Sequence, residues 1–403
     1  MRKRHFLFAS ALALLCSSGA LHAQDFKLTS SGYFKNQGVD VMAFDDIYPE
    51  GHQGGVCIIM NGHRVATNGD IRLEATPGQW QPVPKQLDRK LSDNSITATL
   101  CYPDSSRHLT GFNPMIYPDL HLIYTVQVES KGKHIEVTVD LDRPIPQEFI
   151  GKVGFNLEFF PGSLFGKPWI MDGQSGIFPQ QPNSPLMTTQ PNYLHTGNYH
   201  DGKQSLADMD KLIGKGYSPI VADDIISEPY AKGRKFTSRP DDPYNKVTIE
   251  SLSGDLQLFD GRMNHNNGWF VLRSNIKPGV TKGVVKWIIT PNVVADWMYQ
   301  PVIQTSQIGY HPAQDKEAVI EMDIRDNRKE TAQIIRIDAD GEKVVKNVTP
   351  ANWGKFLRYN YLKVDFTDVK EPGLYKIKYD TSVSPIFRID NDVYARGVWQ
   401  PVL

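Results

Sequence analysis

Three tryptophans lie next to polar side chains in a pattern that suits the binding of sugar rings. Trp80 is flanked by two glutamines, Trp169 precedes Asp172 by three residues, and Trp269 follows a His-Asn-Asn run. Sugars present apolar CH faces that stack on flat aromatic rings, and their hydroxyl groups need planar polar partners nearby. Trp80, Trp169, Asp172 and Trp269 are therefore predicted to bind a polysaccharide or oligosaccharide. The alternative for each tryptophan is a core or interface position, which is what we expect for Trp287 and Trp353.

The densest polar cluster is the run DDIYPEGH at residues 45–52, with three carboxylates and a histidine before a Gly-Gly turn. Calcium needs six to eight oxygen ligands at alternating loop positions, and zinc needs His or Cys at defined spacing. The run completes neither pattern. We expect a solvated, turn-forming loop, with calcium binding and catalysis as the alternatives, and we predict no metal site and no cofactor.

The carboxylates could also form a catalytic pair. Inverting glycoside hydrolysis needs two carboxyl groups roughly 6.5 to 9.5 Å apart, one protonated and one ionised. The candidates are Asp45, Asp46, Glu50, Glu158, Asp172, Asp223 and Asp224. A chain with 45 acidic residues always offers such pairs, so we expect ordinary surface and turn carboxylates and assign no catalytic residue. The sequence also lacks a G-x-S-x-G elbow, a phosphate-binding P-loop, an H-E-x-x-H helix and a C-x-x-C pair.

The N-terminus has the three-part layout of a secretory signal peptide. Three basic residues at positions 2–4 precede an apolar run at 6–15, and small residues continue to Ala23. The apolar run is shorter than the roughly 20 residues that span a bilayer, so no membrane span is predicted. We expect cleavage after Ala23 and export to the periplasm or the cell exterior. A membrane anchor and lipidation at Cys16 are the alternatives.

Loss of residues 1–23 removes three positive charges and changes the formal net charge from -1 to about -4. No basic stretch remains to contact phosphate backbones, so no nucleic-acid partner is expected. Cys57 and Cys101 also remain, each inside a strand-like run. Export would allow them to form a disulfide if they lie close enough, and two buried free thiols are the alternative.

The chain is predicted to be all-β. Segments such as IYTVQVES, HIEVTVDLD and VVKWIIT alternate or cluster apolar residues between turn residues, and 32 glycines with 27 prolines are dispersed without a period. Only Ser205–Ile213 has a helical pattern. The texture of the sequence changes near Gln300-Pro301, from Pro/Gly/Asn-rich loops to regular short strands. We predict a signal peptide at 1–23, a large β-sandwich at 24–300, an immunoglobulin-like sandwich at 301–394 and a linker at 395–403.

The downstream module begins QTSQIGYHPAQDKEAVIEMD and closes EPGLYKIKYDTSVSPIFRIDNDVYARGV. Both ends resemble the N-terminal Ig-like domain of family 9 glycoside hydrolases, which include many cellulases. The resemblance implies a catalytic (α/α)₆ barrel after Tyr394, with a D-A-G-D-type aspartate pair and a distant glutamate, none of which lies in this chain. The run Asp338-Ala339-Asp340-Gly341 looks similar to that motif, but its place between two strand-like runs predicts a hairpin turn.

The segment of about 275 residues upstream also resembles a region that precedes the Ig-like domain in some bacterial relatives, and that resemblance implies no chemistry. Its pattern predicts a large β-sandwich, with the carbohydrate-enzyme supersandwich as a fold-level analogy. We therefore expect the non-catalytic N-terminal portion of an exported family 9-like glycoside hydrolase acting on plant-type β-glucan, which supports a missing catalytic domain. The alternatives are a glycan-binding module and a glycosidase active in the large domain.

Overall fold

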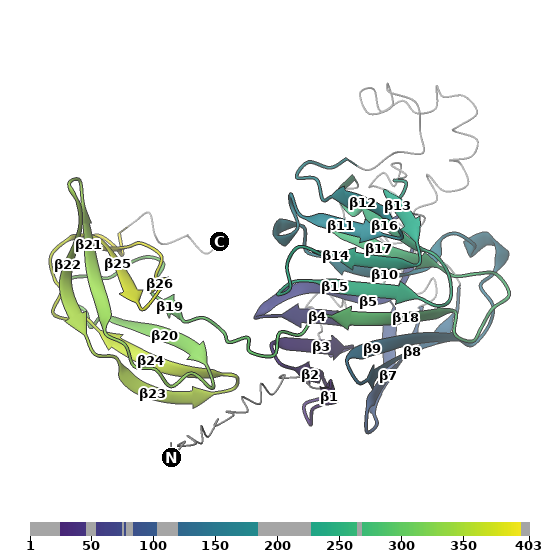
Figure 1. Ribbon diagram of the computed structural model, residues 1–403, viewed down its shortest axis with the longest axis horizontal. Coiled ribbons are helices and arrows are strands. Elements are labelled where there is room, and N and C mark those ends of the chain that lie inside the picture. The colour runs from purple at the N-terminus through teal and green to yellow at the C-terminus, as the bar shows by residue number, and fades with distance from the viewer. Residues whose placement is uncertain are drawn as a thin grey trace, which may run out of the picture.

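The computed structural model describes residues 25–45, 54–74, 76–77, 84–102, 120–183, 227–263 and 268–395. Within these ranges the regular elements are β-strands and three short 3-10 turns, η2 (Gln147–Phe149), η3 (Pro161–Ser163) and η5 (Gly261–Met263), so the predicted all-β class is confirmed. The strands form two separate sandwiches that follow one another along the chain (Figure 1). The predicted signal peptide, the helical segment at 205–213 and the acidic run from residue 46 onward lie outside the described residues.

The first sheet of the large sandwich has nine strands in the order β1-β2-β3-β4-β5-β10-β17-β16-β13, and all its strand pairs are antiparallel. The bounds are β1 Lys27–Leu28, β2 Phe34–Asn36, β3 Val39–Ala43, β4 Val56–Met60, β5 His63–Leu73, β10 Val153–Phe159, β13 Ala231–Gly233, β16 Leu256–Asp260 and β17 Phe270–Asn275.

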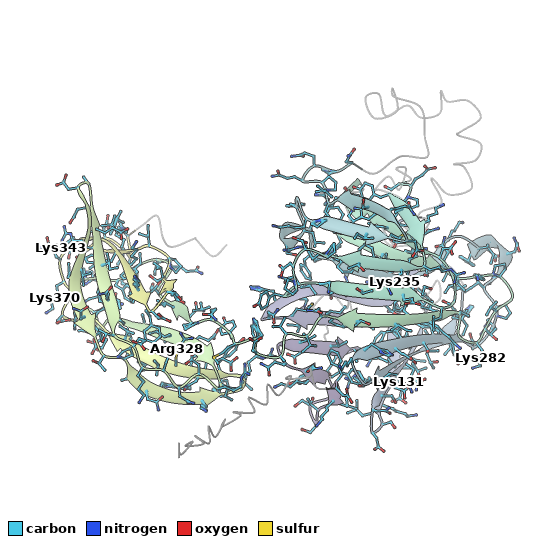
Figure 2. All side chains as sticks on the ribbon, viewed as in Figure 1. Lys131, Lys235, Lys282, Arg328, Lys343 and Lys370 are labelled. Atoms are coloured by element: carbon cyan, nitrogen blue, oxygen red, sulfur yellow. The ribbon has the colours of Figure 1, made fainter. Side chains whose placement is uncertain are left out.

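The second sheet also has nine strands, in the order β12-β11-β14-β15-β18-β9-β8-β7-β6. The bounds are β6 Lys85–Leu91, β7 Ser95–Cys101, β8 Ile123–Lys131, β9 His134–Leu141, β11 Pro168–Met171, β12 Gln174–Ile177, β14 Lys235–Ser238, β15 Val247–Ser251 and β18 Val285–Pro291. Along β8 and β9 every second residue is buried, as expected for strands with one face on a core. Charged side chains such as Lys131, Lys235 and Lys282 lie on the outside (Figure 2).

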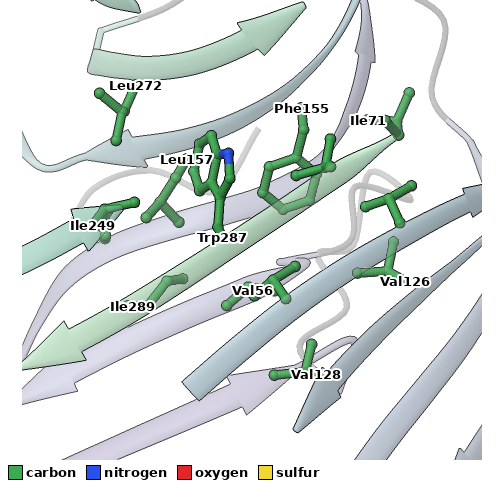
Figure 3. Packing of buried hydrophobic residues seen from close by; sticks show 14 of the residues in the cluster. Val56, Ile71, Val126, Val128, Phe155, Leu157, Ile249, Leu272, Trp287 and Ile289 are labelled. Atoms are coloured by element: carbon green, nitrogen blue, oxygen red, sulfur yellow. The ribbon is translucent and has the colours of Figure 1, made fainter. Parts of the chain in front are cut away.

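The core of the large sandwich lies between these two sheets. Trp287 on β18 is almost fully buried, and its ring meets that of Phe155 on β10 edge-on, with 5.0 Å between centroids (Figure 3). Its indole nitrogen donates to Ser274 Oγ at 3.2 Å, which satisfies the buried N–H. The predicted core position of Trp287 is therefore confirmed.

The C-terminal sandwich packs a four-stranded sheet, β19-β20-β24-β23, on a five-stranded one, β22-β21-β25-β26 with β27 paired to β25. The bounds are β19 Val302–Gln304, β20 Glu317–Asp323, β21 Ala332–Asp338, β22 Gly341–Val348, β23 Ala351–Phe356, β24 Tyr359–Asp365, β25 Gly373–Tyr379, β26 Ser382–Val383 and β27 Phe387–Ile389. Its separate core includes Tyr310, Phe366 and Phe387, whose rings contact one another. An Ig-like sandwich at this end of the chain agrees with the prediction.

Two predictions about this module have different outcomes. The Asp-Ala-Asp-Gly run at residues 338–341 is a hairpin turn between β21 and β22, with Asp338 opposite Gly341. The predicted hairpin turn is therefore confirmed. The core assignment of Trp353 is wrong, because its side chain is 56% exposed. Trp353 lies on the edge strand β23, at an irregularity between Asn352 and Gly354, and no residue of this strand is buried.

Cys57 and Cys101 are not joined by a disulfide. Cys57 on β4 is buried in the first sheet, and its thiol donates to the carbonyl oxygen of Gly54 at 3.2 Å. Cys101 ends β7 in the second sheet and is half-buried. Among the described residues, both cysteines therefore keep their thiol groups, and the alternative without a Cys57–Cys101 disulfide holds.

Candidate functional site

A group of charged and polar side chains is buried on the three neighbouring strands β5, β10 and β17. Its members are Asp70, Arg72, Glu74, Asn156, Glu158 and Arg273, and all are buried. Ile71 and Leu73 alternate with them along β5 and belong to the hydrophobic core. Because successive side chains of a strand point to opposite faces, Arg72 and Glu74 project from the face of the sheet that is turned away from this core.

We call the whole group of six residues the ionic cluster. Arg273 is at the centre of one half of it. Its Nη1 donates to Glu74 Oε1 at 3.2 Å and to Asn156 Oδ1 at 3.1 Å, and its Nη2 donates to the Glu74 carbonyl at 3.0 Å. The Asn156 amide also donates to Glu74 Oε1, at 2.6 Å. Gly154 leaves the space that Arg273 needs, since a Cβ there would lie 2.6 Å from Arg273 Nε.

Glu158 is the centre of the other half. Asn68 donates its side-chain amide to Glu158 Oε2 at 2.6 Å, and Arg72 Nη2 lies 3.9 Å from Glu158 Oε1. Asn68 has a positive φ of 55°, at the irregularity where β5 shifts register against β10. This kink aligns the amide with the carboxylate, so Glu158 is held from both sides.

Burial changes the protonation of two carboxyl groups in the cluster. Loss of hydration raises the pKa of Glu74 to about 7, and Arg273, Arg72 and the Asn156 amide offset only part of this effect while Glu158 adds to it. Burial likewise raises the pKa of Asp70 to about 6, opposed by Arg72, by the Ile71 N–H and by the Tyr124 hydroxyl, which donates to Asp70 Oδ1 at 3.0 Å. Two carboxyl groups can thus hold protons near neutral pH.

The chemistry open to the cluster is acid catalysis or structural pairing. A carboxyl group whose pKa is raised to about 7, as that of Glu74 is, can act as a general acid near neutral pH. Glu74 Oε2 and Arg72 Nε are buried without a hydrogen-bond partner. Many of the other polar contacts join members of the cluster to one another or to adjacent backbone, while Asn68, Asn275 and Tyr124 bond its edges, which is the pattern of a network that fixes a sheet.

A second site is the cleft between the two sandwiches, a cavity of about 380 Å³. One wall comes from β1 to β4, and the other comes from Trp297, Tyr299 and the ends of β20 and β24. Three hydrogen bonds shape it: Gln37 Nε2 to the Trp297 carbonyl at 2.7 Å, Arg325 Nη2 to the same carbonyl at 2.7 Å, and Arg358 Nη1 to Asp40 Oδ2 at 2.9 Å. The Asp40–Arg358 pair joins the large sandwich to the C-terminal one.

The structure places three of the four residues that the sequence predicts to bind sugar. Trp80 lies outside the described residues. Trp169 is only 7% exposed and packs against Gly176 of the neighbouring strand, and Asp172 accepts hydrogen bonds from the backbone N–H groups of Arg234 and Lys235. Trp269 is half-buried beside the other sheet, edge-on to Phe160 at 4.3 Å. Their role in binding stays a prediction.

Of the candidate carboxylates, Glu158 belongs to the ionic cluster. Asp172 follows β11 and accepts the two backbone hydrogen bonds just described, and Asp45 is the last residue of the described range 25–45. Asp46, Glu50, Asp223 and Asp224 lie outside the described residues. Among the residues that the structure places, no group of three or more His, Cys, Asp or Glu side chains could hold a metal ion. No helix within the described ranges is long and apolar enough to cross a membrane.

Sequence reasoning missed the residues around which both sites are built. Arg72 and Glu74 lie in the run DIRLE, where charged and apolar residues alternate, and Arg273 follows the apolar run FVL; charges placed among core residues are the available signal. The cleft residues Trp297-Met298-Tyr299 and Tyr359-Asn360-Tyr361 have aromatics two positions apart, a spacing that places both on one face of an extended chain.

Comparison with known proteins gives a match at the C-terminal end. Residues 298–384 match the family model described as the cellulase N-terminal Ig-like domain. No curated protein is significantly similar to this chain. One solved structure, a Bacteroides ovatus GH9, is 26% identical with a TM-score of 0.19, covering 23% of this chain and 16% of that one. Another, the Slr1438 protein from Synechocystis sp. PCC 6803, is 10% identical with a TM-score of 0.31, covering 72% and 100%.

The alignment with the Bacteroides ovatus protein thus spans well under two thirds of that protein's length. The family match coincides with the sandwich formed by β19 to β27, from just before its first strand to the end of β26. The C-terminal sandwich is accordingly an immunoglobulin-like domain similar to the N-terminal Ig-like domain of cellulases.

Proposed function

We propose that this chain is the non-catalytic, exported portion of a family 9-like glycoside hydrolase that acts on plant-type polysaccharide of the β-glucan class. Its two sandwiches would support a catalytic (α/α)₆ domain, which is the partner that this proposal requires. The observation that carries the proposal is the match of residues 298–384 to the cellulase N-terminal Ig-like domain.

The pairing within the ionic cluster supports a structural role for its carboxylates. Glu74 is held by Arg273 and Asn156, and Glu158 by Asn68 and Arg72. A buried carboxyl group that is paired in this way helps to fix neighbouring strands, and removing its partner leaves an uncompensated charge. This interpretation needs no substrate at the cluster.

The direct test is an assay of reducing-sugar release from soluble β-glucan and xyloglucan by the purified 403-residue chain. The proposal expects no turnover above the blank, and the Glu74→Gln variant should behave in the same way. Turnover by the natural chain that disappears in Glu74→Gln, but persists in the control Glu129→Gln on the exterior of β8, would overturn it.

The reading frame after the codon for Leu403 gives a second, independent check. The proposal expects the frame to continue into helical sequence with an aspartate-rich motif of the D-A-G-D kind. A stop codon at that position in the natural gene contradicts the proposal.

The second candidate function is a glycosidase active in the large sandwich. The observation in its favour is the raised pKa of Glu74, about 7, beside the carboxylate of Glu158. The pH dependence of any measured hydrolytic activity distinguishes the two candidate functions. A bell-shaped profile whose basic limb moves in Glu158→Gln supports the glycosidase, because the pKa of Glu74 depends on that neighbouring charge.

A further inference from the structure

Five aromatic side chains form a continuous row that starts in the cleft and crosses the outer face of the four-stranded sheet. The order is Trp297, Tyr299, Tyr359, Tyr361 and Trp353. The centroids of successive rings are 6.4, 5.2, 6.0 and 5.6 Å apart. Trp297, Tyr299 and Tyr359 line the cavity of about 380 Å³, and Tyr361 and Trp353 extend the row beyond it.

The strand pattern explains why these rings face outward. Along β24 the side chains of Asn360 and Leu362 are buried, while Tyr359 and Tyr361 between them are half-buried on the opposite face. Trp353 reaches the same face from the irregular edge strand β23, and its ring stands perpendicular to that of Tyr361. The module therefore exposes aromatic surface that its own core does not use.

A single carboxylate fixes two of the rings. Glu321 on β20 lies directly opposite Tyr361 and accepts hydrogen bonds from the hydroxyl groups of Tyr361, at 3.1 Å, and Tyr299, at 3.0 Å. These bonds restrict rotation of both rings before any ligand arrives. Such pre-organisation lowers the entropy cost of binding.

Planar polar groups accompany the row on the cleft side. Asp323 is held by both Arg325 Nε and Nη2 at 2.8 Å, and its pKa is lowered to about 2 because the hydrogen bonds from Arg325 and from backbone N–H groups outweigh the desolvation. Asp40 and Arg358 form the second such pair. Carboxylates and guanidinium groups of this kind can bond the paired hydroxyls of a sugar.

We infer that this row and the cleft together bind a glycan chain, with one end of the chain in the cleft and the rest along β24 and β23. The inference goes beyond the proposed function, because a supporting module does not need to bind carbohydrate. A cavity of about 380 Å³ falls within the usual range for small-ligand sites. Exposed aromatic rings beside planar hydrogen-bonding groups match the alternating apolar and polar faces of sugar rings.

Charge and ring geometry narrow the class of glycan. The cleft is lined by four basic side chains and three carboxylates, Lys27, Lys35, Arg325, Arg358, Asp25, Asp40 and Asp323, so the opposing charges nearly cancel and favour a neutral ligand. Successive rings are inclined by 54° to 90°, so the row is not a flat platform. The ligand is therefore a soluble, neutral glycan chain rather than a crystalline surface, and its assignment to the β-glucan class rests on the proposed function.

Affinity electrophoresis of the purified chain in gels containing soluble mixed-linkage β-glucan tests the inference, with calorimetric titration of β-glucan oligosaccharides for the affinity. Retardation of the natural chain is expected. Trp353→Ala and Tyr361→Phe separate stacking from positioning. Trp353→Ala removes a stacking ring and should weaken affinity about tenfold, whereas Tyr361→Phe keeps the ring and loses only the bond to Glu321, so its effect should be smaller.

Leu374→Ala, an exposed position on β25 of the other sheet, is the control and should bind like the natural chain. Thermal unfolding of each variant shows whether the module is still folded. Absence of retardation in the natural chain overturns the inference, and so does retardation that Trp353→Ala leaves intact. Loss of binding in Trp269→Ala alone would place the site on the large sandwich and also overturn it.

Two further gels test the class of ligand. Stronger retention on polygalacturonate that disappears with added salt would show an anion-binding cleft and contradict the neutral class. Sedimentation with crystalline cellulose should leave the chain in solution. None of these measurements depends on hydrolysis, so the binding inference and the proposed function can fail separately.

Discussion

Arg273 on β17 and Glu74 after β5 form a buried ion pair, with Nη1 and Oε1 3.2 Å apart and each side chain 1% exposed. The strand β10 separates them in the sheet and contributes Asn156, which bonds both. The pair therefore ties three adjacent strands together on the face turned away from the hydrophobic core. A charge removed from one side leaves the other without compensation.

At about pH 8, where Glu74 is largely ionised, replacing Arg273 by Met should destabilise the large sandwich by up to about 3–5 kcal/mol, because the buried carboxylate then lacks its cation. The double variant Arg273→Met with Glu74→Met should recover much of this loss. Urea unfolding followed by tryptophan fluorescence measures both. As a control, Lys131→Met removes an exposed partner of Glu129 and should cost less than about 1 kcal/mol. If Arg273→Met and Lys131→Met destabilised the chain equally, the description of Arg273 and Glu74 as a buried pair would be wrong.

Stability of the large sandwich should fall as the pH rises from about 4 to 7. The folded pKa values of Glu74, about 7, and Asp70, about 6, lie above their ordinary values of 4.5 and 3.8. The folded state therefore binds more protons than the unfolded state within this window, and the free energy of unfolding decreases with pH. The raised pKa of Glu74 is the net result of burial and of the four groups that face it, namely Arg273, Arg72, Glu158 and Asn156.

Urea unfolding at about pH 5 and about pH 8 should differ by on the order of 1–3 kcal/mol. In Glu74→Gln the difference should shrink, since the amide does not titrate. A natural chain that is equally stable at both pH values, or a variant with an undiminished pH dependence, would contradict a raised pKa of Glu74 within this window.

Gly309→Ala should destabilise the C-terminal module strongly. Gly309 has a φ of 95°, and a Cβ there would lie 2.3 Å from the backbone oxygen of Arg388, which cannot move because it accepts the Tyr310 N–H at 2.8 Å. Gly341→Ala is the matched control, with a φ of 127° and no neighbour within 4 Å. Backbone strain alone costs about 1–3 kcal/mol, so calorimetry should show a clearly larger decrease in melting temperature for Gly309→Ala.

Trp287→Ala should destabilise the large sandwich by about 3–5 kcal/mol, because it removes the largest buried ring and leaves a cavity beside Phe155. Trp287→Phe should cost less, since most of the apolar contact remains and only the bond to Ser274 is lost. Urea midpoints give both values. A smaller loss for the alanine variant than for the phenylalanine variant would contradict the packing.

The sequence predicted the architecture better than the sites. Alternation along HIEVTVDLD and the Asp-Ala-Asp-Gly turn at residues 338–341 depend on local pattern, and local pattern is what strands and turns follow. It also predicted Trp287 correctly, because β18 is apolar on its inward face. Trp353 has a similar local pattern, but its position on an edge strand depends on which strand pairs with β23, and no short segment contains that information.

Neither site could be predicted from the sequence, because each is formed by residues that are brought together only in the folded chain. Arg273, Glu74 and Asn156 are brought together by pairing of β5, β10 and β17, which are far apart in the chain. Trp297, Tyr359 and Trp353 meet only after the C-terminal module has folded. The spacing of Tyr359 and Tyr361, a signal that sequence reasoning missed, places both on one face, but no spacing shows that Tyr299 and Glu321 lie on the same side.

The order of the strands in the two sandwiches also determines how the modules reach their folded states. The centre of the large sandwich joins β9 to β18 and β10 to β17, so its core is complete only when residues near 290 are available. The C-terminal sandwich joins strands within residues 302–389. Folding slows as contacting residues become more distant in sequence. After dilution from denaturant, the smaller module should therefore be native while the larger one is still collapsing around an incomplete sheet.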